Sequence, residues 1–139
     1  MPQFPADPWF QDFIARINAS EEYRKAAETW EGDVAFVVEA EPDKRVPADV
    51  WALLDLWHGE CRGGGVIDQE RGAAARYVIR APYSRWKEVI RGTLEPVRGM
   101  MQGKLKLQGD LATIVRNVQA ASALVRIVGQ VDTVFPDEA

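Results

Sequence analysis

The chain of 139 residues contains one cysteine, Cys61, and one histidine, His58. A single thiol cannot form a disulfide within the chain. One histidine and one cysteine also cannot supply the three or four protein ligands of a zinc site. The acidic residues do not follow the spacing of a calcium-binding loop. We therefore expect no metal and no cofactor.

The sequence also lacks an excess of positive charge, because 17 Lys and Arg residues face 21 Asp and Glu residues, for a net charge of -4. Nucleic-acid binding requires a concentrated basic face, so no nucleic-acid partner is predicted. No apolar run approaches the ~20 residues that cross a bilayer. The first residues lack the basic and apolar regions of a signal peptide. These absences predict a cytoplasmic protein with a single domain over residues 1–139.

His58 and Cys61 are close enough in sequence to raise the hypothesis of a hydrolase or isomerase. However, His58-Gly59 fits the tip of a tight hairpin, where both residues adopt positive φ. No third residue that would orient the histidine is indicated. A turn histidine and a buried thiol explain the two residues better, so we predict that the protein is not an enzyme. The run Gly63-Gly64-Gly65 lacks the Gly-Lys-Ser/Thr ending of a phosphate loop.

Other charged residues fall on the predicted strands. Glu39, Asp55 and Glu60 lie on neighbouring strands, and cross-strand ion pairs explain them better than an acid–base pair. Arg76 and Arg80 share one strand face, and we expect them in water. Contact of these arginines with a ligand head group at a pocket mouth is the alternative.

The apolar pattern predicts an α+β fold with a roughly five-stranded, mostly antiparallel sheet covered on one face by helices. Asp7 is expected to cap the first helix and Ser20 or Asn18 the second, which should end near Trp30. Asp110 is expected to cap the helix that begins at residue 111. Residues 68–72 are expected to form a turn. Three or four antiparallel strands should come first. The predicted strands cover residues 33–40, 50–57, 60–66, 74–81 and 104–108, and later helices cover 82–91, 96–102 and 111–128.

Apolar side chains are abundant relative to a fold of this size. The chain has five Trp, three Tyr and five Phe residues, and Met100 and Met101 adjoin each other. The apolar stripe of the helix predicted over 111–128 is wider than packing on a sheet usually needs. A wide stripe over a one-sided sheet favours a tunnel for an apolar ligand, while a well-filled core remains the alternative.

The segment from Trp86 to Asp110 is the most distinctive part of the sequence. It combines Trp86 with Ile90-Arg91-Gly92, Glu95-Pro96 and the stretch MQGKLKLQGD at 101–110. This segment resembles the sterol carrier protein type 2 family. The resemblance implies an apolar tunnel that binds a fatty acid, acyl-CoA, sterol-like molecule or phospholipid without chemistry. Carried onto this sequence, the resemblance assigns the tunnel lining to Phe36, Val38, Leu54, Leu56, Tyr77, Ile79, Trp86, Ile90, Met100, Met101, Leu105, Leu107, Ile114, Val118 and Leu124.

The same fold also fits a protein of another class, a protein-interaction or dimerisation module with a filled core. In that hypothesis exposed aromatic residues near Trp9, Trp51 and Trp57 form the interface. A homodimer and a transient membrane contact both remain open. The net charge of -4 disfavours attachment to anionic membranes unless a local basic patch exists.

Overall fold

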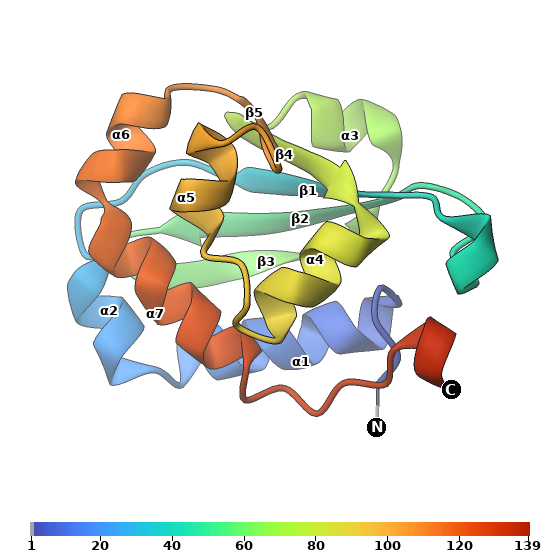
Figure 1. Ribbon diagram of the computed structural model, residues 1–139. Coiled ribbons are helices and arrows are strands. Elements are labelled where there is room, and N and C mark those ends of the chain that lie inside the picture. Colours follow the sequence, from blue (N-terminus) through green and yellow to red (C-terminus); the bar gives the residue numbers. More distant parts are fainter. Residues whose placement is uncertain (1) are drawn as a thin grey trace.

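The computed structural model describes residues 2–139, which form one sheet with helices packed against it (Figure 1). No helix within this range is both long and apolar enough to span a membrane. The strands are β1 (Val34–Glu39), β2 (Val50–Trp57), β3 (Glu60–Ile67), β4 (Tyr77–Pro82) and β5 (Lys106–Gln108). The helices are α1 (Asp7–Asn18), α2 (Glu21–Ala26), α3 (Gln69–Ala73), α4 (Tyr83–Ile90), α5 (Pro96–Met101), α6 (Leu111–Arg116) and α7 (Val118–Val128), with 3-10 turns η1 (Pro42–Lys44) and η2 (Pro136–Glu138).

The five strands form one mixed sheet in the order β3-β2-β1-β4-β5. Three of the pairings are antiparallel, but β1 and β4 run parallel, with Phe36 opposite Ile79. The predicted α+β fold with a mostly antiparallel five-stranded sheet is confirmed. Of the three or four antiparallel strands expected at the start, the structure has three, because the chain then crosses the sheet through α3 and β4 enters beside β1 in the same direction.

The two faces of the sheet are covered unequally. On β1, Val34 and Val38 belong to the large core beneath α1, α2, α4 and α7, whereas Ala35 and Val37 belong to a smaller core on the other face. The smaller core includes Trp51 and is covered by α3, which the sequence prediction had as a turn. The main layer of helices therefore lies on one face, as expected, and α3 covers part of the opposite face (Figure 1).

Polar residues at the helix starts set several helix boundaries. Ser20 accepts a hydrogen bond from the amide of Tyr23 and caps α2, which ends at Ala26, earlier than predicted. The predicted capping role of Asp7 is wrong, because Ala6 is the capping position of α1. Asp7 instead accepts a hydrogen bond from the amide of Val66 at 2.9 Å and so joins α1 to strand β3.

The helix predicted over 111–128 is broken in two at Asn117. Asp110 caps α6 as expected, by accepting from the amide of Ala112 at 3.1 Å. Asn117 then leaves the helical conformation, and its Nδ2 donates to the carbonyl of Thr113 at 2.8 Å. Asn side chains compete in this way with the backbone for hydrogen bonds. The break changes the direction of the chain between α6 and α7 (Figure 1).

The hairpin between β2 and β3 turns at His58 and Gly59, whose φ angles of 50° and 81° match the predicted tight turn. A Cβ on Gly59 would lie 2.6 Å from the carbonyl oxygen of Arg24, so the turn packs directly on the end of α2. Strand β3 lies at the edge of the sheet, as its glycine run predicts.

Candidate functional site

An apolar cavity of about 150 Å³ lies between the sheet and the helices. Its wall draws on the N-terminal segment, β1, β2, β4 and all helices except α3. The lining residues are Phe4, Trp9, Phe10, Phe13, Tyr23, Trp30, Val34, Phe36, Val38, Leu54, Leu56, Ile79, Trp86, Val89, Ile90, Pro96, Met100, Leu105, Ile114, Asn117, Ala120, Ala121, Leu124, Val125 and Val128.

The tryptophans of the cavity wall direct their only polar group to partners in the surrounding protein. Trp86 Nε1 donates to the carbonyl of Val37 at 2.9 Å, and Trp30 Nε1 donates to the carbonyl of Gly32 at 2.8 Å. The indole rings therefore present carbon to the cavity while their N–H groups are satisfied. This arrangement makes the wall suitable for hydrocarbon and unsuitable for a strongly polar ligand.

Several residues of the cavity wall are only half-buried. Phe36 lies on the central strand β1, on the face covered by helices, yet its side chain is only partly buried. Its ring meets Trp86 edge to face, with centroids 5.5 Å apart. A residue in the middle of a covered sheet face keeps accessible area only where the covering layer leaves space, and here that space is the cavity. Partly buried Ile90, Met100 and Leu124, from three different helices, line the same space.

The two ends of the described chain hold one side of the cavity together. The amide of Phe4 donates to the carbonyl of Val134 at 3.0 Å, and Trp9 Nε1 donates to Thr133 Oγ1 at 2.8 Å. These bonds fix Phe4 and Trp9, whose rings meet edge to face at 4.8 Å. Figure 1 shows the N-terminal segment and the segment before η2 lying side by side. Residues far apart in sequence thus form one aromatic wall.

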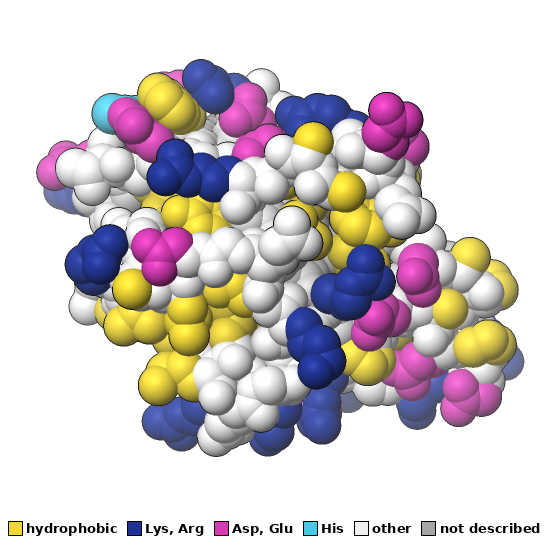
Figure 2. Space-filling model, turned by 90° about the horizontal axis from the view of Figure 1, so that it is seen from above, with side chains coloured by type: hydrophobic (Ala, Val, Ile, Leu, Met, Phe, Trp, Pro, Cys, Tyr) yellow, Lys and Arg dark blue, Asp and Glu magenta, His cyan; other side chains and the backbone are white. Residues whose placement is uncertain are grey.

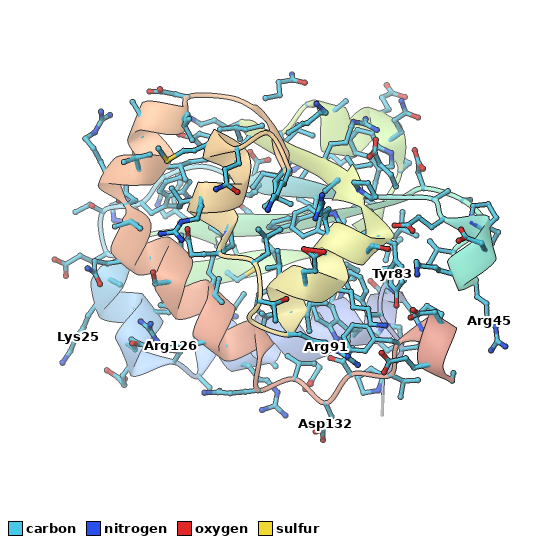
Figure 3. The ribbon with its side chains drawn as sticks, in the orientation of Figure 1. Lys25, Arg45, Tyr83, Arg91, Arg126 and Asp132 are labelled. Atoms are coloured by element: carbon cyan, nitrogen blue, oxygen red, sulfur yellow. The ribbon has the colours of Figure 1, made fainter. Side chains whose placement is uncertain are left out.

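A charged cluster attaches η2 to α4 near this wall. Lys87 Nζ contacts Asp137 at 2.9 Å and Glu138 at 2.6 Å. Tyr83, labelled in Figure 3, donates to Asp137 at 2.6 Å. Burial alone would raise the pKa of Asp137, but the hydrogen bonds from Tyr83 and Lys87 outweigh it and hold the pKa below its ordinary value. Burial and the neighbouring Asp137 raise the pKa of the Tyr83 hydroxyl, which stays protonated. The cluster fixes the C-terminal segment and has no substrate-binding geometry of its own.

Most of the lining residues predicted from the sequence lie on the wall of this cavity. They are Phe36, Val38, Leu54, Leu56, Ile79, Trp86, Ile90, Met100, Leu105, Ile114 and Leu124. Their contact with a ligand remains a prediction.

The other four predicted lining residues lie outside the wall. Tyr77 is buried but packs behind it, with its ring 5.1 Å from Trp30. Met101 is 68% exposed, and Val118 is 38% exposed, because both occupy the outer side of their helices. Leu107 is partly buried on the short edge strand β5. The break at Asn117 rotates the helix that follows and so moves Val118 away from the predicted stripe.

The sequence interpretation missed two groups of wall residues. The first is the aromatic set from the N-terminal region, which includes Phe4, Trp9, Phe10 and Phe13. Phe10 and Phe13 lie at helical spacing and Phe4 precedes the helix, but nothing in the sequence placed this region against the cavity. The second group comprises small and polar residues of α7 and its cap, among them Asn117 and Ala121.

Apart from the Tyr and Trp residues, Asn117 is the one residue of the cavity wall whose side chain can form hydrogen bonds. One of its amide hydrogens goes to Thr113, and its Oδ1 accepts no hydrogen bond from residues 2–139. It is partly buried where α6 meets α7. An otherwise apolar pocket with one polar group at its edge fits a ligand with a long apolar part and a small polar end.

His58 and Cys61 have separate partners. His58 Nε2 lies 2.6 Å from Glu31 Oε2, and Cys61 Sγ lies 3.3 Å from the carbonyl of Gly63. Burial raises the pKa of the Cys61 thiol, which disfavours the reactive thiolate. Neither residue lines the cavity. Residues 2–139 contain no group of three or more His, Cys, Asp and Glu side chains arranged to hold a metal ion.

Of the three carboxylates expected in cross-strand ion pairs, Asp55 and Glu39 form them, and Glu60 has no ion pair within residues 2–139. Arg62 binds Asp55 with Nη2 at 3.0 Å, and Arg80 reaches Glu39 at 3.4 Å. The guanidinium of Arg80 also lies 5.3 Å from the centre of the Trp51 ring, on the sheet face away from the cavity. The alternative placing of Arg80 at the cavity mouth is therefore wrong.

The tryptophans proposed for a dimer interface differ in exposure. Trp9 and Trp51 are buried, whereas Trp57 is 39% exposed and lies under Arg62 at 4.7 Å. The expectation that Trp9 and Trp51 are exposed is wrong, because the cavity wall and α3 cover them. One partly exposed tryptophan does not make the aromatic interface that the dimer hypothesis requires.

The open five-stranded sheet with helices on one face is the fold of sterol carrier proteins. A crystal structure of sterol carrier protein 2 is 40% identical in sequence over 94% of this chain and 100% of that one, with a TM-score of 0.85. The solution structure of a possible sterol carrier protein from Thermus thermophilus is 41% identical over 93% of this chain and 90% of that one, with a TM-score of 0.83. The model of the SCP-2 sterol transfer family matches residues 10–122. The chain belongs to this family, which confirms the resemblance seen in the sequence.

A more distant structure shares the fold alone. The palmitated SCP2L2 from Aedes aegypti is 15% identical over 83% of this chain and 92% of that one, with a TM-score of 0.57. No curated protein matches the chain in sequence.

Proposed function

We propose that residues 1–139 act as one lipid-binding unit that holds the acyl chain of a fatty acid, acyl-CoA or phospholipid in the apolar cavity and carries it without chemistry. The observation that carries this proposal is the wall itself, which combines aromatic and aliphatic side chains from one sheet face and from every α-helix but α3 around about 150 Å³ of space. Membership of the SCP-2 sterol transfer family supports lipid binding. The fold neighbour from Aedes aegypti is described as palmitated, which supports an acyl ligand.

The size of the cavity favours a flexible chain over a rigid ring system. Pockets for drug-sized ligands usually measure about 300–1,000 Å³, so a cavity of about 150 Å³ is small. A methylene chain can occupy such a cavity in part and leave the rest of the ligand outside it. Each buried methylene contributes ~0.8 kcal/mol, so affinity should rise with chain length and discriminate weakly between similar chains.

Asn117 is proposed to meet the polar end of the ligand. The α6–α7 break places its amide at the edge of the wall, where the second Nδ2 hydrogen, which the bond to Thr113 does not use, is free to donate to a carboxylate or ester oxygen. A hydrogen bond of this kind contributes on the order of 1 kcal/mol. That contribution orients the ligand, while the apolar wall supplies most of the affinity.

Displacement of a fluorescent fatty acid from the delipidated protein tests the proposed function. Palmitate should compete, and lipid extracted from the protein as purified should contain acyl chains on mass spectrometry. The matched control is Leu53→Trp, at a buried position on the other sheet face, beside the smaller core. Leu54→Trp, which directs the ring into the cavity, should abolish displacement. Absence of extracted lipid together with absence of fluorescent-ligand binding would contradict the proposal.

A further inference from the structure

Four aromatic residues of the cavity wall carry a polar group, and one of these groups has no partner. Trp9, Trp30 and Trp86 donate their Nε1 hydrogens to other residues at 2.8, 2.8 and 2.9 Å. The fourth residue is Tyr23, and no residue between 2 and 139 forms a hydrogen bond with its hydroxyl. Tyr23 is therefore the exception in a wall that otherwise satisfies its aromatic polar groups.

The hydroxyl of Tyr23 borders the cavity. The side chain is 1% exposed, so bulk solvent does not reach it. Within the described part of the chain, every side-chain nitrogen or oxygen that is fully enclosed has a hydrogen-bond partner. A hydroxyl without a partner must then touch open space, and the space that Tyr23 lines is the cavity. The wall thus presents a free O–H group to an apolar interior.

Contacts of α2 fix the position of this hydroxyl. Tyr23 is the one buried residue of the helix, and its amide donates to Ser20 Oγ at 3.1 Å. The β2–β3 turn packs directly on the backbone of Arg24. Glu22 pairs with Arg126 of α7 at 2.6 Å. A ligand that meets the hydroxyl therefore finds it already in place, which lowers the ordering cost of binding.

The chemistry of the wall selects a neutral oxygen as the partner. Burial raises the pKa of the Tyr23 hydroxyl, which stays protonated and can donate. None of the lining residues carries a charge, whereas Figure 2 shows Lys, Arg, Asp and Glu side chains on the outside of the molecule. A carboxylate inside this wall would lose its water without gaining a cation, which costs far more than one hydrogen bond returns. A hydroxyl or carbonyl oxygen needs only the one donor.

We propose that Tyr23 determines ligand specificity by donating a hydrogen bond to a hydroxyl or carbonyl oxygen carried along the bound acyl chain. The proposal rests on the proposed function, because it states which acyl chains the cavity favours. An unsubstituted chain covers the hydroxyl and leaves it without a partner, whereas an oxygen at the matching carbon satisfies it. Sites with such a donor discriminate against the analogue that lacks the oxygen. The favoured ligands are hydroxy- or oxo-acyl chains.

Competition between stearic acid and monohydroxystearic acids tests the assignment. The hydroxyl is placed at single carbons from the carboxyl end to the methyl end, and each acid displaces a fluorescent fatty acid. The measurements use the wild type and Tyr23→Phe, which removes the oxygen and keeps the ring. For one hydroxyl position, affinity relative to stearic acid should be at least about fivefold higher in the wild type than in Tyr23→Phe. Stearic acid itself should bind Tyr23→Phe at least as tightly as the wild type.

The matched control is Tyr77→Phe. Tyr77 is also 1% exposed but lies outside the cavity wall, so its variant should show the relative affinities of the wild type. Thermal denaturation gives a second readout. Tyr23→Phe should keep the Tm of the wild type, because the lost hydroxyl bonds to no other residue in the described chain.

The results separate this inference from the proposed function. A preference for one hydroxystearic acid that Tyr23→Phe loses and Tyr77→Phe keeps supports the inference. Equal relative affinities in the wild type and Tyr23→Phe overturn it. Weaker binding of stearic acid by Tyr23→Phe also overturns it, because the hydroxyl would then meet the carboxylate, and a Tm well below that of Tyr77→Phe would reveal a partner within the protein. Wild-type protein that binds no fatty acid at all contradicts the proposed function instead.

Discussion

A larger side chain on the cavity-facing side of α7 tests whether the protein has a cavity that can hold a ligand or a core that is already filled. Ala121 lines the cavity and is partly buried, so a larger side chain there grows into the space. The ring in Ala121→Phe occupies the room of about four methylene groups of a bound chain. At ~0.8 kcal/mol for each methylene, affinity for palmitate should fall by about 3 kcal/mol, which corresponds to a factor of about 150 in Kd.

The same substitution should leave the free energy of unfolding within about 1 kcal/mol of the wild type, because the ring replaces space and displaces no atoms. Overpacking of a filled core would instead cost about 1–3 kcal/mol. Ala15→Phe, on the exposed side of α1, is the matched control for helix propensity. Urea denaturation followed by circular dichroism gives the stability, and fluorescent fatty-acid displacement gives the affinity.

The reasoning is refuted if Ala121→Phe binds palmitate as tightly as the wild type. It is also refuted if the variant loses more than about 2 kcal/mol of stability while Ala15→Phe does not. The first result would place the ligand elsewhere, and the second would show a core without room.

Three further predictions concern other positions. Asn117→Leu should weaken palmitate binding about fivefold in displacement titrations and leave a hydrocarbon of equal length unaffected, and equal effects on both would contradict its polar role. Gly109→Ala should lower the free energy of unfolding in urea by about 1–3 kcal/mol, because φ is +136° and the new Cβ would lie 2.7 Å from Tyr77 Cδ1. Gly92→Ala, at φ +79° with open space around it, should cost less, and an equal loss would exclude the contact as the cause. The pKa of Asp137 lies below its ordinary value of 3.8, so its contribution to stability is present above that pH and is lost as the pH falls below it. Thermal denaturation should show Tm falling more steeply below pH ~4 for the wild type than for Asp137→Asn, and identical slopes would contradict the assignment.

Local chemistry made much of the fold predictable from the sequence. The alternation in β1 separated Val34, Phe36 and Val38 from Ala35 and Val37, and the structure assigns these two sets to opposite faces. Turn and cap residues act on their immediate neighbours in the chain. The hairpin at His58-Gly59 and the helix caps at Ser20 and Asp110 could therefore be predicted from the sequence. Short-range rules decide such features because the interacting groups are close in sequence.

Long-range packing accounts for what the sequence did not reveal. The parallel pairing of β1 with β4 depends on a crossover whose path no local pattern encodes. The aromatic wall needs Phe4 to pair with Val134, across nearly the whole chain. The break at Asn117 depends on one side-chain hydrogen bond to Thr113, and it shifted Val118 out of the predicted lining.

The central claim is that the space beside Phe36 and Leu124 exists to hold an acyl chain. A crystal structure of the protein grown with palmitate tests it most directly. The account predicts continuous tubular electron density between β1 and α7, with the carboxyl end toward Asn117. Density for palmitate only on the outer surface, or a cavity closed by its own side chains at saturating ligand, would contradict it.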